Sequence, residues 1–120
     1  MYAMVGAENA LWGPLLEKAI AKYVGNYWHM DTGVNTDGIG FLNGGPHYYL
    51  SHYDENRRFD PDEFWDVITY HDKERQIITA KSNANAGDNI VPNHSYVILN
   101  EVTLDSGQRL LLLRNPWGRE

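Results

Sequence analysis

The 120-residue sequence contains no cysteine. Disulfide bonds and thiolate metal sites are therefore excluded, and so is a cysteine nucleophile within these residues. The sequence also lacks a basic run: ten Lys and Arg against sixteen Asp and Glu give a net charge of −6, which argues against a nucleic-acid or anionic-membrane surface. No apolar stretch approaches the length of a bilayer span, and the first residues lack the pattern of a signal peptide. We expect a cytoplasmic protein without nucleic-acid or membrane partners.

The composition is that of a globular chain. Hydrophobic residues make up 42% and aromatic residues 12%, which is enough for a packed core in one domain or part of one. Histidine is the only strong nitrogen ligand for a metal ion, and none of the five histidines has a tight ligand spacing such as His-Glu-x-x-His. We therefore predict no metal site and no cofactor in this chain. The histidines are His29, His47, His52, His71 and His94.

Two helices have clear local signals. Apolar residues recur every four positions from residue 11 to 24, and Gly25 follows as a natural helix stop. Asp60 can cap a second helix, because Pro61 suits the first helical position and Glu63 the third. This second helix is predicted to run to about His71.

The remaining segments before residue 94 are predicted from turn and strand composition. Glycines at 33, 38 and 40 among polar residues indicate a loop over 26–43, and Gly44-Gly45 is read as a turn into a strand at 47–51. A β-branched run predicts another strand at 76–80. Residues 83–93 are polar and are expected to form a loop that leads to His94.

A hairpin organises the C-terminal part. Residues 95–99 and 110–113 are apolar runs, and residues 104–107 between them have turn chemistry. If these four residues form the loop, His94 lies opposite Trp117 and Asn115 lies on the same face. The Cα atoms of His94 and Asn115 would then be about 7–8 Å apart, a distance that an imidazole and an amide nearly bridge. A one-residue bulge would close or spoil this approach.

A histidine and an asparagine placed like His94 and Asn115 act together in the catalysis of cysteine proteases. There an imidazole removes the thiol proton, and an asparagine holds the ring in the required orientation and tautomer. The alternative interpretation is structural, since a histidine at a strand end is often only a hydrogen-bonded residue, and Asn-Pro-Trp-Gly can be a turn that ends a strand. The correct chain order and the shared face favour the catalytic interpretation.

Three segments resemble the catalytic domain of calpains. Residues 93–97, Asn-His-Ser-Tyr-Val, are similar to the Gly-His-Ala-Tyr-Ser segment of that family, and residues 114–118 match its Arg-Asn-Pro-Trp-Gly signature. Residues 11–22 resemble the helix that closes the first, cysteine-bearing lobe of calpains. The resemblance implies an α+β, papain-like cysteine protease fold. Residues 1–43 would be the C-terminal end of the first lobe, including its last helix, and residues 46–120 an antiparallel, β-rich second lobe, with Gly44-Gly45 as the boundary.

The resemblance also implies roles for individual residues. His94 is expected to be the general base and Asn115 its orienting partner, with Gly45, Asn93 and Trp117 at the substrate. Asn93 stands where calpains carry glycine, so its side chain is expected to crowd the substrate backbone there. In calpains the counterpart of Trp117 lies at the mouth between the lobes and wedges them apart without calcium. The alternative is that Trp117 is an ordinary core tryptophan.

Two classes of function follow from this resemblance. The first is the His/Asn part of a calpain-like cysteine endopeptidase acting on proteins or peptides, whose nucleophile comes from the cysteine-bearing first lobe of the same parent chain. The second is a non-catalytic binding or scaffold module that keeps the fold without the activity. Retention of both His94 and Asn115 favours the first. In a longer protein the family pattern allows for calcium, bound by acidic residues after Glu120.

Overall fold

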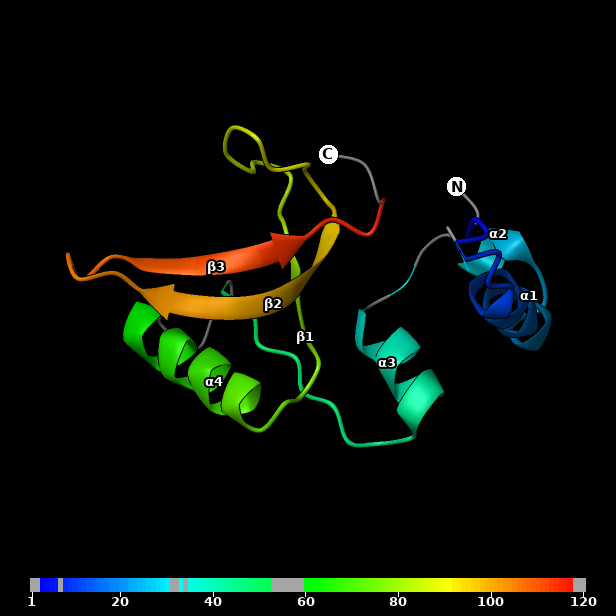
Figure 1. Cartoon of the computed structure of the whole chain (residues 1–120), viewed down its shortest axis with the longest axis horizontal. Helices are drawn as coiled ribbons and strands as arrows, with labels where there is room; N and C mark the ends of the chain where they lie inside the picture. The colour runs from blue at the N-terminus through cyan, green and yellow to red at the C-terminus, as the bar shows by residue number, and fades with distance from the viewer. Residues whose placement is uncertain (1–2, 7, 31–32, 34, 53–59, 118–120) are drawn as a thin grey trace. The chain divides into compact units, whose positions relative to one another are not determined.

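The computed structural model describes residues 3–6, 8–30, 33, 35–52 and 60–117. This part of the chain holds four helices and three strands, which confirms the predicted α+β class but not the expected four or more strands (Figure 1). No described helix is both long enough and apolar enough to cross a membrane. The elements are α1 Trp12–Val24, α2 Tyr27–Met30, α3 Asn35–Asn43, α4 Pro61–Lys73, β1 Ile78–Lys81, β2 Ser95–Thr103 and β3 Arg109–Arg114.

The chain forms two compact units, Met1–His47 and Tyr48–Glu120. The lobe boundary expected at Gly44-Gly45 concerns the lobes of the family, and it stays a prediction.

In the first unit, α1 confirms the predicted helix, and Gly25 after its last residue has a φ of 110°, which suits a glycine stop. The loop predicted over 26–43 is wrong, because α2 and α3 occupy most of it. Glycines weaken a helix by about 1 kcal/mol each, so composition argued against α3. One packing contact favours the helix: the ring of Phe41 lies 4.7 Å from that of Tyr23 on α1.

The strand predicted at 47–51 is also wrong. These residues form neither a helix nor a strand, and Tyr48, Tyr49 and Leu50 are exposed. Aromatic and β-branched residues favour a strand only where a neighbouring strand accepts their backbone hydrogen bonds. No strand in the described part of the chain pairs with this segment.

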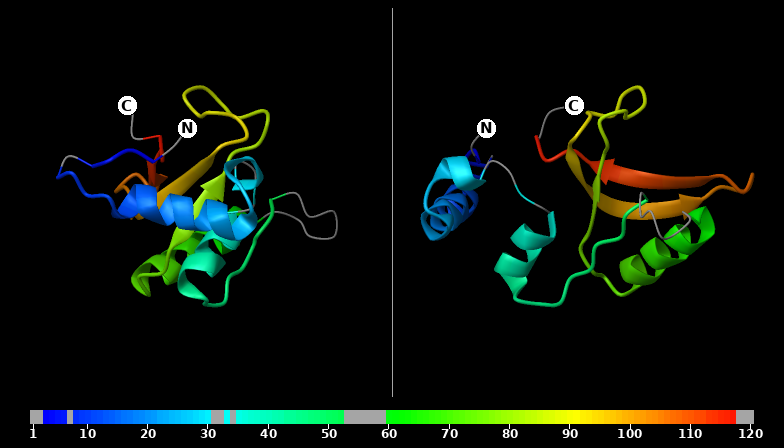
Figure 2. Two further views of the ribbon diagram at one scale, coloured as in Figure 1. Left: turned by 90° about the vertical axis from the view of Figure 1, so that its right-hand side faces the viewer. Right: turned by 180° about the vertical axis from the view of Figure 1, so that it is seen from behind.

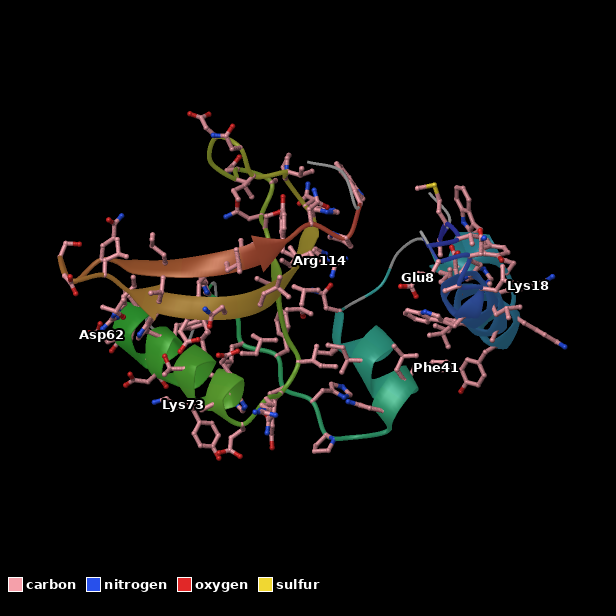
Figure 3. All side chains as sticks on the ribbon, viewed as in Figure 1. Glu8, Lys18, Phe41, Asp62, Lys73 and Arg114 are labelled. Carbon is pink, nitrogen blue, oxygen red and sulfur yellow. The ribbon has the colours of Figure 1, made fainter. Side chains whose placement is uncertain are left out.

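In the second unit, α4 begins as predicted. One side-chain oxygen of Asp60 accepts hydrogen bonds from the backbone N–H groups of Asp62 and Glu63, and Pro61 takes the first helical position. The helix runs to Lys73, slightly beyond the predicted end at His71. Asp62 and Lys73 mark its two ends in Figure 3.

The three strands form one antiparallel sheet in the order β1-β2-β3. Strand β1 lies two residues later than predicted at its start. Helix α4 packs against β1 and β2, as the view from behind in Figure 2 shows. Tyr96 and Ile98 on β2 are buried, so the core of this unit lies at the centre of the sheet.

The edge strand β3 is tied to α4 by one arginine. The Nη1 atom of Arg109 lies 2.6 Å from the Oδ1 atom of Asp62, and its guanidinium lies 5.4 Å from the centroid of Trp65. Asp62 is largely exposed, so the ion pair contributes less than about 1 kcal/mol. The stacked guanidinium adds packing that a charge alone would not provide.

The turn of the β2–β3 hairpin is one residue longer than predicted. Thr103 pairs with Arg109, and the backbone N–H of Leu104 donates to the carbonyl of Gln108 at 2.8 Å. The turn therefore spans 104–108, with Gly107 at a φ of 82°. The predicted four-residue loop over 104–107, which would have paired Thr103 with Gln108, is therefore wrong.

A bulge at Leu99 restores the predicted register closer to residue 94. Asn100 pairs with Leu112 but Ile98 pairs with Leu113, so β2 carries one extra residue between these two pairs. The extra residue in β2 cancels the extra residue in the turn. From Ile98 toward the start of β2, the strands consequently face each other as the sequence predicts.

Candidate active site

His94 and Asn115 come together at one end of the hairpin. His94 directly precedes β2 and Asn115 directly follows β3. Because the two strands are antiparallel, the start of β2 and the end of β3 lie at the same end of the hairpin (Figure 1). The Nε2 atom of His94 lies 2.9 Å from the Oδ1 atom of Asn115, within hydrogen-bond distance. Both residues are half-buried.

The surroundings of Asn115 determine which ring nitrogen carries the proton. Its Oδ1 atom also lies 3.0 Å from the backbone nitrogen of Trp117, and that N–H group can only donate. The side-chain atom facing both partners must therefore be the oxygen, so Nε2 of His94 is the donor. In the neutral ring, Nδ1 then keeps the lone pair and can take up a proton.

Two aromatic side chains hold the imidazole in place. The Trp117 ring lies 4.4 Å from the His94 ring at a tilt of 45°, and the Tyr96 ring meets it edge-on at 5.0 Å. Tyr96 is buried, whereas Trp117 is 43% exposed. Trp117 thus covers part of the imidazole with its own indole while remaining open to solvent.

Asn93, the residue before the histidine, has a left-handed backbone. Its φ is 52°, and its N–H donates to the carbonyl of Asn83 across the base of the loop at 3.1 Å. Asparagine and glycine both adopt this conformation readily, which gives a physical reason for either residue at this position. A contact of Asn93 with substrate stays a prediction.

Replacing Asn93 should show how strongly its left-handed backbone limits the residue types that this position accepts. Alanine in a left-handed conformation costs about 1–2 kcal/mol, so Asn93→Ala should lower the free energy of unfolding by about 1 kcal/mol. Asn93→Gly should stay within about 0.5 kcal/mol of the wild type, since glycine tolerates this φ but is more flexible when unfolded. Urea unfolding followed by circular dichroism measures both.

Asn85→Ala is the matched control for this experiment. Asn85 lies in the same loop and is not among the residues with a positive φ. If Asn93→Ala proves no less stable than Asn85→Ala, the left-handed backbone is not the reason for an asparagine or glycine at position 93.

Gly45 belongs to the first unit. Its backbone N–H donates to the side-chain oxygen of Asn43 at 3.0 Å, and an added Cβ atom would lie 3.5 Å from that oxygen, an ordinary contact. The packing of this chain therefore does not require glycine at position 45. The expected role in substrate binding stays a prediction, and it would need the close approach of another backbone.

Sequence reasoning missed one residue at this site, Ser82. It follows β1 directly, and its hydroxyl oxygen lies 2.9 Å from the backbone nitrogen of His94. Its proximity depends on the register between β1 and β2, which nothing in the local sequence specifies. The only available signal was a hydroxyl residue two positions after the strand predicted at 76–80.

A metal centre has no candidate in the described ranges. Among the residues that the structure describes, no three His, Asp or Glu side chains lie close enough together to hold a metal ion. Calcium binding by a longer protein stays a prediction.

Comparison with known proteins matches residues 1–120 to the family described as calpain family cysteine protease. The calpain-type cysteine protease DEK1 of Zea mays is 29% identical over 126 residues, which cover 99% of this chain and 6% of the maize protein. The calpain-2 catalytic subunit of Mus musculus is 30% identical over 129 residues, covering 99% of this chain and 18% of the mouse protein. Calpain-14 of Homo sapiens is 28% identical over 120 residues, covering 93% of this chain and 16% of the human protein.

No solved structure gives a significant match. The chain spans only a small part of the length of the relatives it matches, 6% of the maize protein and 18% of the mouse protein. The family match nevertheless extends over the whole chain and confirms the resemblance found in its motifs. The chain therefore belongs to the calpain family of cysteine proteases.

Proposed function

We propose that this chain supplies the general base and its orienting partner to a calpain-type cysteine endopeptidase. His94 is the base and Asn115 the orienting residue. The observation that carries the proposal is the hydrogen bond between Nε2 and Oδ1 at 2.9 Å, in which the backbone of Trp117 fixes the amide oxygen. This arrangement leaves Nδ1 as the atom that accepts a proton.

The chemistry requires a thiol from outside these 120 residues, since they contain no cysteine. The partner in the proposal is the cysteine-bearing first lobe of a longer calpain-like chain. Nδ1 of His94 takes the thiol proton, and the thiolate attacks the carbonyl carbon of a peptide bond. The imidazolium then gives this proton to the leaving amine, which releases the C-terminal product and leaves an acyl-enzyme.

Water completes the cycle. Nδ1 removes a proton from the water as it attacks the thioester, and it passes this proton to the sulfur as the acid product leaves. Throughout, Asn115 accepts the hydrogen bond from Nε2, so it holds the plane of the ring in both protonation states. A cytoplasmic setting belongs to the proposal because thiols stay reduced there.

The chain alone should be catalytically silent. An imidazole without a thiol has no nucleophile to activate, so hydrolysis of a fluorogenic peptide should not exceed the buffer rate. Turnover by the chain alone that disappears with His94→Ala would mean that another nucleophile acts here.

Joining the chain to a cysteine-bearing calpain lobe should produce hydrolysis that a thiol-alkylating reagent blocks. The lobe with its cysteine replaced by alanine is the matched control. If the joined protein binds peptide but hydrolyses none, the scaffold interpretation replaces the proteolytic one. The coding sequence upstream of Met1 offers a simpler check, since a Cys-Trp motif there would provide the thiol.

A further inference from the structure

Ser82 forms hydrogen bonds with both main-chain groups of His94, its N–H and its carbonyl. The backbone N–H of Ser82 donates to the carbonyl of His94 at 2.8 Å, and the backbone N–H of His94 donates to the Oγ atom of Ser82 at 2.9 Å. Lys81 pairs with Ser95 in the β1–β2 ladder, so Ser82 and His94 are the next pair in the same register. The serine hydroxyl takes the place that a backbone carbonyl would occupy in a continuing ladder.

The same hydroxyl also fixes the loop that leads to His94. Its oxygen lies 2.6 Å from the carbonyl oxygen of Val91 and 3.1 Å from that of His94, so its single proton is best placed toward Val91. The N–H of Val91 donates to the Tyr96 hydroxyl at 2.9 Å. Ser82 and Tyr96 together therefore bind both polar main-chain groups of Val91.

Figure 1 shows where this loop lies relative to the hairpin. The loop between β1 and β2 stands at the end of the hairpin where β3 finishes, opposite the turn of 104–108. His94 is the last residue of that loop. Any shift of its main chain moves the imidazole relative to Asn115, whose own position is set by β3 and by the N–H of Trp117.

We infer that Ser82 is a positioning residue for His94. Asn115 fixes the orientation of the ring, and the Ser82 hydroxyl fixes the main chain from which the ring projects. The catalytic meaning of this assignment rests on the proposed function, but the geometric part does not. Ser82→Ala tests the hydroxyl specifically, because alanine keeps the backbone N–H that donates to His94 and removes only the group that accepts from His94 and donates to Val91.

The test is nuclear magnetic resonance of the 120-residue chain with ¹⁵N-labelled histidine, well below its melting temperature. The wild type should show His94 with the proton on Nε2. In Ser82→Ala, exchange of the His94 amide proton should accelerate about tenfold, and the fraction with the proton on Nε2 should fall as the bond to Asn115 weakens. Ser82→Thr keeps a hydroxyl on a side chain suited to a strand end, and it should restore both values.

Ser106→Ala is the matched control. Ser106 lies in the hairpin turn, and its hydroxyl makes only a 3.5 Å contact with the backbone nitrogen of Gln108. It should leave His94 unchanged. An unaltered tautomer and exchange rate in Ser82→Ala, or failure of Ser82→Thr to restore them, would overturn the assignment, as would an equal change in Ser106→Ala.

This measurement needs no thiol, so it can fail independently of the proteolytic proposal. In a protein joined to a cysteine-bearing lobe, Ser82→Ala should lower kcat and change KM little, as expected for a residue that positions the base. If the tautomer changes but His94→Ala leaves hydrolysis intact, Ser82 still positions His94 and the proposed function falls. If His94→Ala abolishes hydrolysis but the tautomer is unaffected in Ser82→Ala, only the role of Ser82 is lost.

Discussion

Substituting His94 with alanine in a protein that joins this chain to a cysteine-bearing calpain lobe should lower kcat/KM by about 10⁴-fold or more. The imidazole is required twice, first to ionise the thiol and then to deprotonate water, and general acid–base catalysis contributes about 10²–10⁴-fold for a single step. The thiol, left with an ordinary pKa of about 8.5, would be mostly protonated at neutral pH. Steady-state hydrolysis of a peptide substrate measures this loss.

His71→Ala is a suitable control for the same assay. His71 lies on α4, where its Nδ1 atom contacts the side-chain oxygen of Gln76 at 2.6 Å, and it has no part in the proposed chemistry. Thermal melts of both variants should show that the second unit still folds. Undiminished turnover in His94→Ala would reduce the histidine to a structural contact, and so would a loss of activity that follows only the loss of folding.

Replacing Asn115 should have a smaller effect that falls mainly on kcat. Asn115→Ala leaves the basicity of the ring but removes the oxygen that holds Nε2, so we expect kcat to fall by about 10²-fold with KM little changed. The backbone N–H of Trp117 loses the same acceptor, and the residue that covers the imidazole is therefore released as well.

Asn115→Asp tests whether the side chain at position 115 acts by orienting the His94 ring or only by filling space. A carboxylate still accepts hydrogen bonds from both Nε2 and the Trp117 N–H, so this variant should retain more of kcat than Asn115→Ala does. The aspartate also adds a negative charge that favours the imidazolium, so its pH profile should differ from that of the wild type. Equal kcat values for the alanine and aspartate variants would contradict an orienting role.

Those elements of the fold whose signals are local could be predicted from the sequence. Helix α4 is an example, because Asp60 and Pro61 specify its start without reference to the rest of the chain. Helix α3 could not be predicted in this way. Gly38 and Gly40 oppose it, and the contact of Phe41 with Tyr23 depends on how α1 and α3 pack. A strand at 47–51 was expected from residue types alone, but strands also need a partner.

The meeting of His94 and Asn115 could be predicted because side chains alternate strictly along a strand. The predicted register was nevertheless wrong at the turn, and the bulge at Leu99 corrects it before the site. Leu99 is an apolar residue within an apolar run, so no composition signal marks it. Ser82 was missed for a related reason, since its contact with His94 arises from pairing between strands that are separated by a loop.

The bulge at Leu99 divides the hairpin into two segments with separate tolerances to change in chain length. The register between the turn and Asn100 is set by the length of the turn. The register from Ile98 toward the start of β2 depends also on the extra residue of the bulge. An insertion or deletion at 104–108 can thus be absorbed by gaining or losing a bulge in the outer segment, and His94 and Asn115 need not shift. Evolution can lengthen or shorten the tip of this hairpin, for instance to change what it touches, while the pair at the other end keeps its geometry.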